Sequence, residues 1–69
     1  MNYARMIKNL RDKLIMTQEE FADLLGVSIT SVNRWETGKH LPTTKVKRKI
    51  VELCKQNNVN MEDVVWDLL

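Results

Sequence analysis

The 69-residue sequence predicts an all-α fold, a single domain of five short helices. A chain of this length buries only roughly 60% of its unfolded surface, too little to divide between two cores. Apolar residues recur every three or four positions, and no useful stretch alternates in the way that an amphipathic strand does. Two glycines and one proline are the strong interruptions, so short turns should join the helices.

The first two helices are predicted at about residues 2–14 and 17–25. The first carries an apolar stripe at helical spacing, formed by Tyr3, Ile7, Leu10 and Leu14, with Met6 beside it. The second should begin at a capping box, in which the Thr17 hydroxyl accepts from the amide three residues on while the Glu20 carboxylate reaches back. It should end at Gly26, which readily adopts a left-handed conformation, and bury Phe21, Ala22 and Leu25.

The third helix is predicted from Ser28, as its N-cap, to about Thr37, with Gly38 ending it. Val27 should pack beneath its start, and Val32 should face inward along it. Trp35 could stack on a ligand base, but it shares the inward side with Val32, so we expect it to belong to the scaffold.

The last two helices follow a loop through Pro42. The fourth should be capped by Thr43 or Thr44 and bury a stripe of Val46, Ile50, Leu53 and Cys54. Its first turns also hold four bases, Lys45, Lys47, Arg48 and Lys49. These bases either bind phosphate at one or two points or form a solvated face. A short fifth helix at about residues 61–69 has acidic residues at its start and a stripe of Met61, Val64, Val65 and Leu68.

Composition excludes several classes of function. No apolar run approaches the roughly 18 residues of a membrane span, and the N-terminus lacks the apolar core of a signal peptide, so we expect a cytoplasmic protein. Cys54 is the only cysteine and His40 the only histidine, which argues against a disulfide, a metal site and a cysteine nucleophile. We expect Cys54 in the core, no cofactor, and no enzymatic activity.

Charge is distributed unevenly along the chain. Residues 1–57 hold eleven bases against six acids, a net charge of +5, whereas residues 58–69 hold three acids and no base. The basic part could face a polyanion while the acidic part faces elsewhere, although an uneven solvated surface would give the same pattern.

The second and third helices form the unit that carries function. Because only Leu25, Gly26, Val27 and Ser28 lie at their junction, they must cross steeply, as in a helix-turn-helix. The third helix would then present polar side chains that suit a DNA major groove, where Arg bridges guanine acceptors, Asn reads adenine, and Ile or a Thr methyl touches thymine. These side chains are Ile29, Thr30, Asn33, Arg34 and Thr37.

Over nearly its whole length the chain resembles the Cro and lambda-repressor type helix-turn-helix family of DNA-binding regulators, often called the Xre family. The matching pieces come in order and spacing within 26 residues: Thr17-Gln18-Glu19-Glu20-Phe21-Ala22, Leu25-Gly26-Val27-Ser28, Val32, and Arg34-Trp35-Glu36-Thr37-Gly38-Lys39 through Pro42. The resemblance implies a lambda-repressor-like DNA-binding domain, with the helix-turn-helix motif at about residues 17–37.

The resemblance also implies roles for individual residues. The base-reading positions would be Ser28, Ile29, Thr30, Asn33 and Arg34. Ile29 stands where the family often has a polar residue, so it would make apolar contact. Gln18 opens the first motif helix, where the family touches phosphate and braces the reading helix. Thr37, Lys39 and His40 would follow the DNA backbone, while Arg11 and Glu36 would form an internal salt bridge.

The resulting hypothesis is a regulator of transcription, a repressor by default, whose partner is a double-stranded DNA operator. The stripe at 61–69, with Trp66 beside it, either completes the monomer core or forms the seam of a homodimer. The alternative hypothesis is an antitoxin or protein-binding adaptor that acts mainly through this C-terminal helix.

Overall fold

The structure is a computed structural model that describes residues 3–59, and in this range the chain forms four α-helices and no strand. They are α1 (Tyr3–Lys13), α2 (Gln18–Leu25), α3 (Ile29–Glu36) and α4 (Thr44–Gln56), all close to the predicted bounds. The predicted fifth helix lies outside the described residues, so the five-helix count is not confirmed. No helix in the described range is long and apolar enough to cross a membrane.

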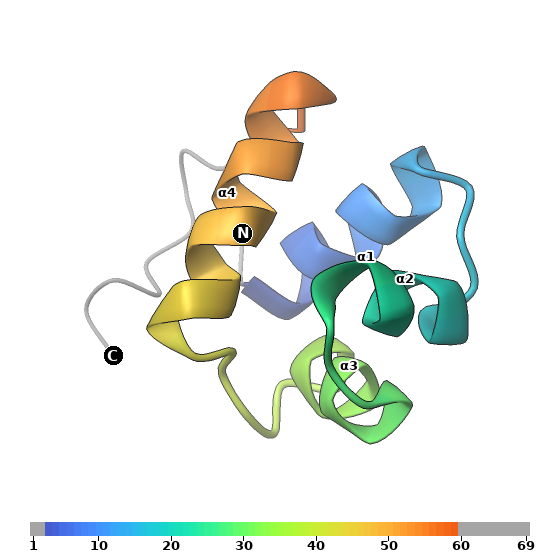
Figure 1. The fold of residues 1–69 in the computed structure, drawn as a ribbon, viewed down its shortest axis with the longest axis vertical. Coiled ribbons are helices and arrows are strands. Elements are labelled where there is room, and N and C mark those ends of the chain that lie inside the picture. The colour runs from blue at the N-terminus through green and yellow to red at the C-terminus, as the bar shows by residue number, and fades with distance from the viewer. Residues whose placement is uncertain (1–2, 60–69) are drawn as a thin grey trace.

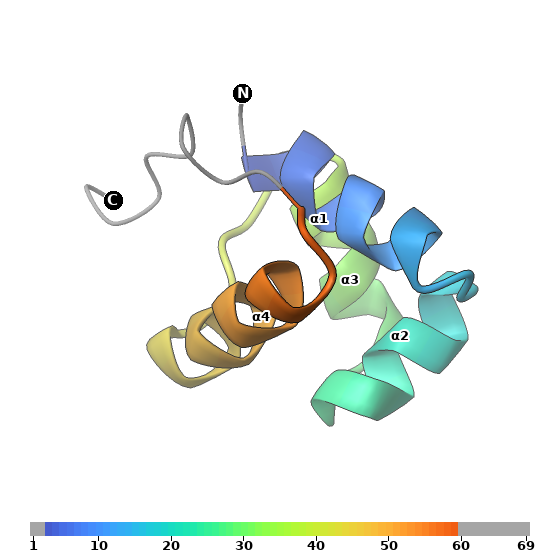
Figure 2. The ribbon, with the colours of Figure 1, turned by 90° about the horizontal axis from the view of Figure 1, so that it is seen from above.

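The helices pack around one another as Figures 1 and 2 show. α2 and α3 follow each other closely and lie in contact, α1 packs against α3, and α1 also contacts α4. A loop of seven residues carries the chain from α3 to α4. α1 therefore connects the α2–α3 pair to α4 and acts as the centre of the fold.

The core takes its side chains from all four helices. The buried hydrophobic residues are Met6, Ile7, Leu10, Phe21, Ala22, Leu25, Val32, Trp35, Val46, Ile50 and Cys54. This list confirms the predicted inward faces of α2 and α3, including the scaffold position of Trp35. The prediction for Leu53 is wrong, because that side chain is only half-buried and lines a groove between α2 and α4. Tyr3 and Leu14, at the two ends of the α1 stripe, are likewise only partly buried.

Local hydrogen bonds explain where α2 begins and ends. The Thr17 hydroxyl accepts from the Glu20 amide at 3.1 Å, and the Glu20 carboxylate accepts from the Thr17 amide at 2.9 Å, so the predicted capping box is confirmed. Gly26 ends the helix with φ of 72°. At α4, Thr43 occupies the N-cap position, but its hydroxyl makes no capping hydrogen bond, contrary to the prediction.

The turn between α1 and α2 contains a strained residue. Ile15 has φ of 57°, and its side chain is 90% exposed. A left-handed backbone is unfavourable for a β-branched residue, because its side chain crowds the backbone. The turn holds this conformation through the Ile15 amide, which donates to the Asp12 carbonyl at 3.0 Å, and the Met16 amide, which donates to the Arg11 carbonyl at 3.2 Å.

Candidate nucleic-acid interface

The turn between α2 and α3 fixes how the second helix sits on the first. The amide of Val27 donates to the Ala22 carbonyl at 3.0 Å, next to the left-handed Gly26. Ser28 then caps α3, since its hydroxyl accepts from the Ser31 amide at 3.2 Å. Three residues thus separate two helices of eight residues each. So tight a connection gives the steep crossing of a helix-turn-helix.

α3 has a buried side and an exposed side. Val32 is fully buried and Trp35 is 4% exposed, which anchors the helix against the core. Four predicted base-reading side chains lie on the exposed side, at Ile29, Thr30, Asn33 and Arg34. The side chains of Asn33 and Arg34 make no hydrogen bond or ion pair to another described residue. Their donors and acceptors therefore remain available to a ligand.

Two further predicted contact residues use their hydroxyls to close the ends of α3. The Ser28 hydroxyl accepts from the Ser31 amide and lies 3.0 Å from the Ser31 hydroxyl. The Thr37 hydroxyl donates to the carbonyls of Asn33 at 2.9 Å and Arg34 at 3.2 Å. A hydroxyl has one hydrogen and two lone pairs, so Thr37 offers a ligand only acceptor capacity in this rotamer.

A part-buried ion pair connects α3 to α1. Arg11 donates from Nε to Glu36 Oε2 at 2.8 Å and from Nη2 to Glu36 Oε1 at 3.0 Å, a two-pronged geometry. The side chains are 15% and 5% exposed, respectively. The hydrogen bond to Glu36 raises the pKa of Arg11 above its ordinary value, against the opposing effect of burial. Because Glu36 is the only acid in α3, the pairing leaves the exposed side of that helix without negative charge.

Gln18 and Met16 extend this ion pair to α2 and the turn before it. The Gln18 side-chain amide donates to Glu36 Oε1 at 3.1 Å, and Arg11 Nη1 donates to the Met16 carbonyl at 3.0 Å. Sequence reasoning gave Gln18 a phosphate contact together with a bracing role, and the structure places its amide on Glu36. α1, the turn, α2 and α3 are thereby joined at one cluster, which orients the exposed side of α3.

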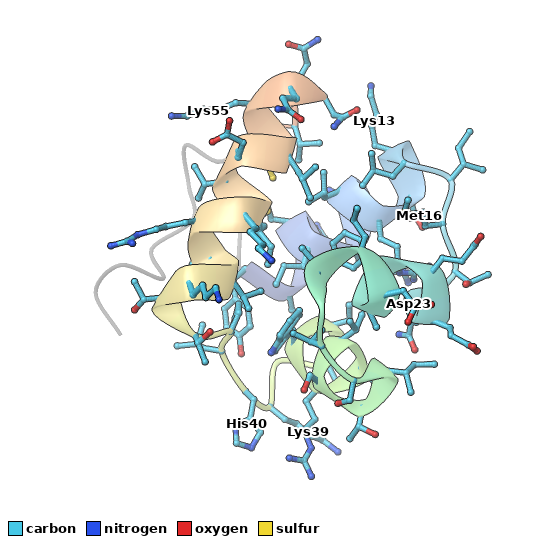
Figure 3. All side chains as sticks on the ribbon, in the orientation of Figure 1. Lys13, Met16, Asp23, Lys39, His40 and Lys55 are labelled. Atoms are coloured by element: carbon cyan, nitrogen blue, oxygen red, sulfur yellow. The ribbon has the colours of Figure 1, made fainter. Side chains whose placement is uncertain are left out.

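The loop after α3 brings two more predicted residues beside Arg34. The amides of Lys39 and His40 donate to the Arg34 carbonyl, at 2.9 and 3.4 Å, and the left-handed Gly38 makes this reversal possible. Both side chains are exposed and project from the same end of the molecule, far from Lys13 and Lys55 (Figure 3). Lys39 therefore adds positive charge next to the exposed side of α3.

Two bases of α1 near the end of α3 were missed by sequence reasoning. Arg5 and Lys8 line a shallow hollow together with Glu36, Thr37 and Gly38. The three-residue spacing of Arg5 and Lys8, which places them on one helical face, was the signal available. The bases of α4 are spread around that helix instead, and Arg48 and Lys49 line the groove facing α2.

The described residues offer little for catalysis or metal binding. In residues 3–59 no group of three or more His, Cys, Asp and Glu side chains could hold a metal ion. Cys54 is fully buried, its sulfur lies 3.3 Å from that of Met6, and burial raises its thiol pKa to about 11. Such a thiol is protonated at neutral pH and is a poor nucleophile.

Comparison with known proteins gives a consistent result. Residues 7–63 match the family described as Helix-turn-helix (HTH_3). The type II methyltransferase M.SsoII of Shigella sonnei is 41% identical over 54 residues, which cover 74% of this chain and 14% of that protein. Antitoxin PezA of Streptococcus pneumoniae serotype 4 is 37% identical over 62 residues, covering 88% of this chain and 37% of that protein. An uncharacterized HTH-type transcriptional regulator of Bacillus subtilis, YgzD, is 33% identical over 60 residues, covering 87% of this chain and 86% of that protein. No solved structure matches the chain.

Proposed function

This chain belongs to the helix-turn-helix family HTH_3, and on that premise we propose that it is a sequence-specific, DNA-binding regulator of transcription. The observation that carries the proposal is the exposed side of α3, where Asn33 and Arg34 have no partner among the described residues. The opposite side is anchored by Val32 and Trp35, so α3 is presented as a rigid rod. A rod of this width fits the major groove of DNA.

In the proposed complex, α3 reads base edges and its surroundings bind phosphate. Arg34 would bridge the two acceptors of a guanine, and Asn33 would pair with an adenine. Ile29 and Thr30 would contact thymine methyl groups. Each good two-pronged contact is worth about 1–3 kcal/mol of discrimination. Ser28 would contact a base edge at the start of the helix.

Phosphate contacts would supply most of the affinity. Lys39 and His40 would lie along the backbone with Thr37, and the α2 N-terminus would direct its free amides and the second amide hydrogen of Gln18 at a phosphate. Lys8 adds positive charge at the edge of this surface. Operator affinity should therefore fall as salt rises, with a slope near 0.9 per phosphate neutralised.

We infer repression by occlusion of a promoter as the mode of action, carried out in the cytoplasm without a cofactor or catalytic step. The match to the methyltransferase covers only 14% of that protein, so it gives no ground for assigning a methyltransferase reaction to this chain. A two-fold dimer through the C-terminal helix at about residues 61–69 would place two copies of α3 roughly 34 Å apart, on a near-palindromic operator.

The similarity to an antitoxin favours one alternative function, an adaptor that binds a partner protein. In that case the acidic and apolar segment at 61–69 would do the main work, and the exposed side of α3 would be secondary. Both activities could reside in one protein. A variant at Arg34 distinguishes the two activities, because Arg34→Ala should still bind a partner protein but should bind the operator poorly.

The proposal is tested by selecting bound duplexes from a random pool and then titrating the best duplex with variants. Arg34→Ala should weaken binding by about 10- to 100-fold and relax the preference at one base pair. Lys13→Ala is the matched control, because Lys13 is also an exposed base but projects from the far end of the molecule (Figure 3). Equal binding by wild type and Arg34→Ala, or no enrichment of any sequence, would contradict the proposal.

A further inference from the structure

An apolar groove runs between α2 and α4, and no residue of α3 lines it. Its volume is about 410 Å³. Leu24 and Leu25 of α2 line one side, and Leu53 of α4 lines the other with Arg48 and Lys49. The groove is thus apolar between the helices and basic along α4, with Glu52 as the one acid among its lining residues.

The exposure of Leu24 indicates that this groove is a binding surface. Leu24 is 46% exposed, and Leu53 is only half-buried, although both lie next to the core residue Leu25. A contiguous apolar patch with a polar rim is typical of an interaction site, whereas scattered apolar residues are not. Apolar grooves between two helices commonly receive a third, amphipathic helix.

The charge of the groove selects the chemistry of its occupant. Two bases against one acid favour a segment that is apolar on one side and acidic on the other. The C-terminal segment, residues 60–69, has this composition, with three acids and no base, and with apolar residues at helical spacing. As a helix its ten residues would span about 15 Å, which matches a groove along the 13-residue α4.

We propose that the groove between α2 and α4 binds the C-terminal segment, residues 60–69, of a second copy of the chain. The inference rests on the dimer proposed above and names the surface that receives the segment. In a two-fold dimer each chain would give its segment to the groove of the other, so that two equivalent contacts hold the pair together.

The path of the chain at Val59 favours a second copy over the chain's own segment. The Val59 amide donates to the Cys54 carbonyl at 2.9 Å, and the side chain packs against the core. Figure 2 shows the described chain leaving the end of α4 toward α1, away from α2. The chain's own segment would have to reverse this direction to reach the groove, whereas a segment from another copy has no such constraint.

Charge reversal tests the contact without DNA. Sedimentation equilibrium of the full chain should show a dimer. The groove variant carries Arg48→Glu and Lys49→Glu, and the segment variant carries Glu62→Lys and Asp63→Lys. Each variant should raise the dissociation constant of the dimer by roughly ten-fold or more. Mixing the two variants should restore the dimer, because both contacts in the mixed pair are again complementary. The matched control, Lys8→Glu with Lys13→Glu, makes the same charge change at exposed positions of α1 and should dimerise as wild type does.

Leu24→Gln provides a second test that changes no charge. It should weaken the dimer, keep the helical circular dichroism of the wild type, and bind a single operator half-site normally. A wild type that stays monomeric at all concentrations would overturn the proposal, as would groove variants that dimerise normally. Failure of the mixed variants to pair would show that the segment binds its own chain, which also overturns it. If the wild type does not bind an operator half-site at all, the proposed function is refuted, whatever its oligomeric state.

Discussion

Replacing Glu36 by alanine should destabilise this domain far more than the loss of a surface carboxylate would. Glu36 is 5% exposed and accepts three hydrogen bonds, two from Arg11 and one from Gln18. Its removal leaves the Arg11 guanidinium, whose side chain is 15% exposed, with the Met16 carbonyl at 3.0 Å and the exposed Asp12 carboxylate at 3.9 Å. Removing one partner of a buried ion pair lowers the free energy of unfolding by about 3–5 kcal/mol. Because water partly reaches Arg11, we expect a loss of about 2–3 kcal/mol here.

That loss is large for a domain of this size. Small domains have a free energy of unfolding of about 0.05–0.15 kcal/mol per residue, so for 69 residues we expect roughly 3–10 kcal/mol. The midpoint of thermal unfolding should fall by roughly 10–20 °C, since 1 kcal/mol corresponds to about 4–8 °C in small domains. Urea unfolding followed by circular dichroism measures the free energy directly.

A double-mutant cycle identifies the cause of the loss. Arg11→Met combined with Glu36→Ala removes both charges, so the double variant should be more stable than Glu36→Ala alone, with a coupling energy of at least about 1 kcal/mol. If Glu36→Ala lowers the free energy of unfolding by less than about 0.5 kcal/mol, as loss of an exposed ion pair would, the reasoning is refuted. Additive effects of the two substitutions would refute it as well.

Three further predictions concern stability. Ile15→Gly should raise the free energy of unfolding by about 0.5–1 kcal/mol in urea unfolding, because relief of about 1–2 kcal/mol of left-handed strain exceeds the entropic cost of glycine, whereas Ile15→Val should change nothing. Thr17→Ala should lower it by about 1 kcal/mol through loss of the capping box, and an unchanged value would argue against that cap. Burial raises the pKa of Cys54 from 9.0 to about 11, so the thiol ionises more readily when unfolded. The contribution of this thiol to the free energy of unfolding should therefore be fully present below pH 9. It should fall by up to about 2.7 kcal/mol as pH rises through 11, a loss that Cys54→Ala should not show.

The sequence by itself determined the four helices of the described range and most of the core. The capping box at Thr17 and the glycine at position 26 act within one turn of the chain, so their effect is readable from neighbouring residues. The spacing of Val32 and Trp35 also predicted which side of α3 is buried, because helical periodicity is a local property. The base-reading roles of the exposed residues stay predictions.

Only the tertiary structure decided how distant residues meet. Arg11 and Glu36 are 25 positions apart; the family resemblance indicated that they pair, but the addition of Gln18 and the Met16 carbonyl depends on how α1, α2 and α3 pack. Leu53 has the spacing of a core residue and yet lines a groove, because its surroundings are set by the distance between α2 and α4. Periodicity specifies the side of a helix on which a residue lies, whereas burial depends on what the rest of the fold places against that side.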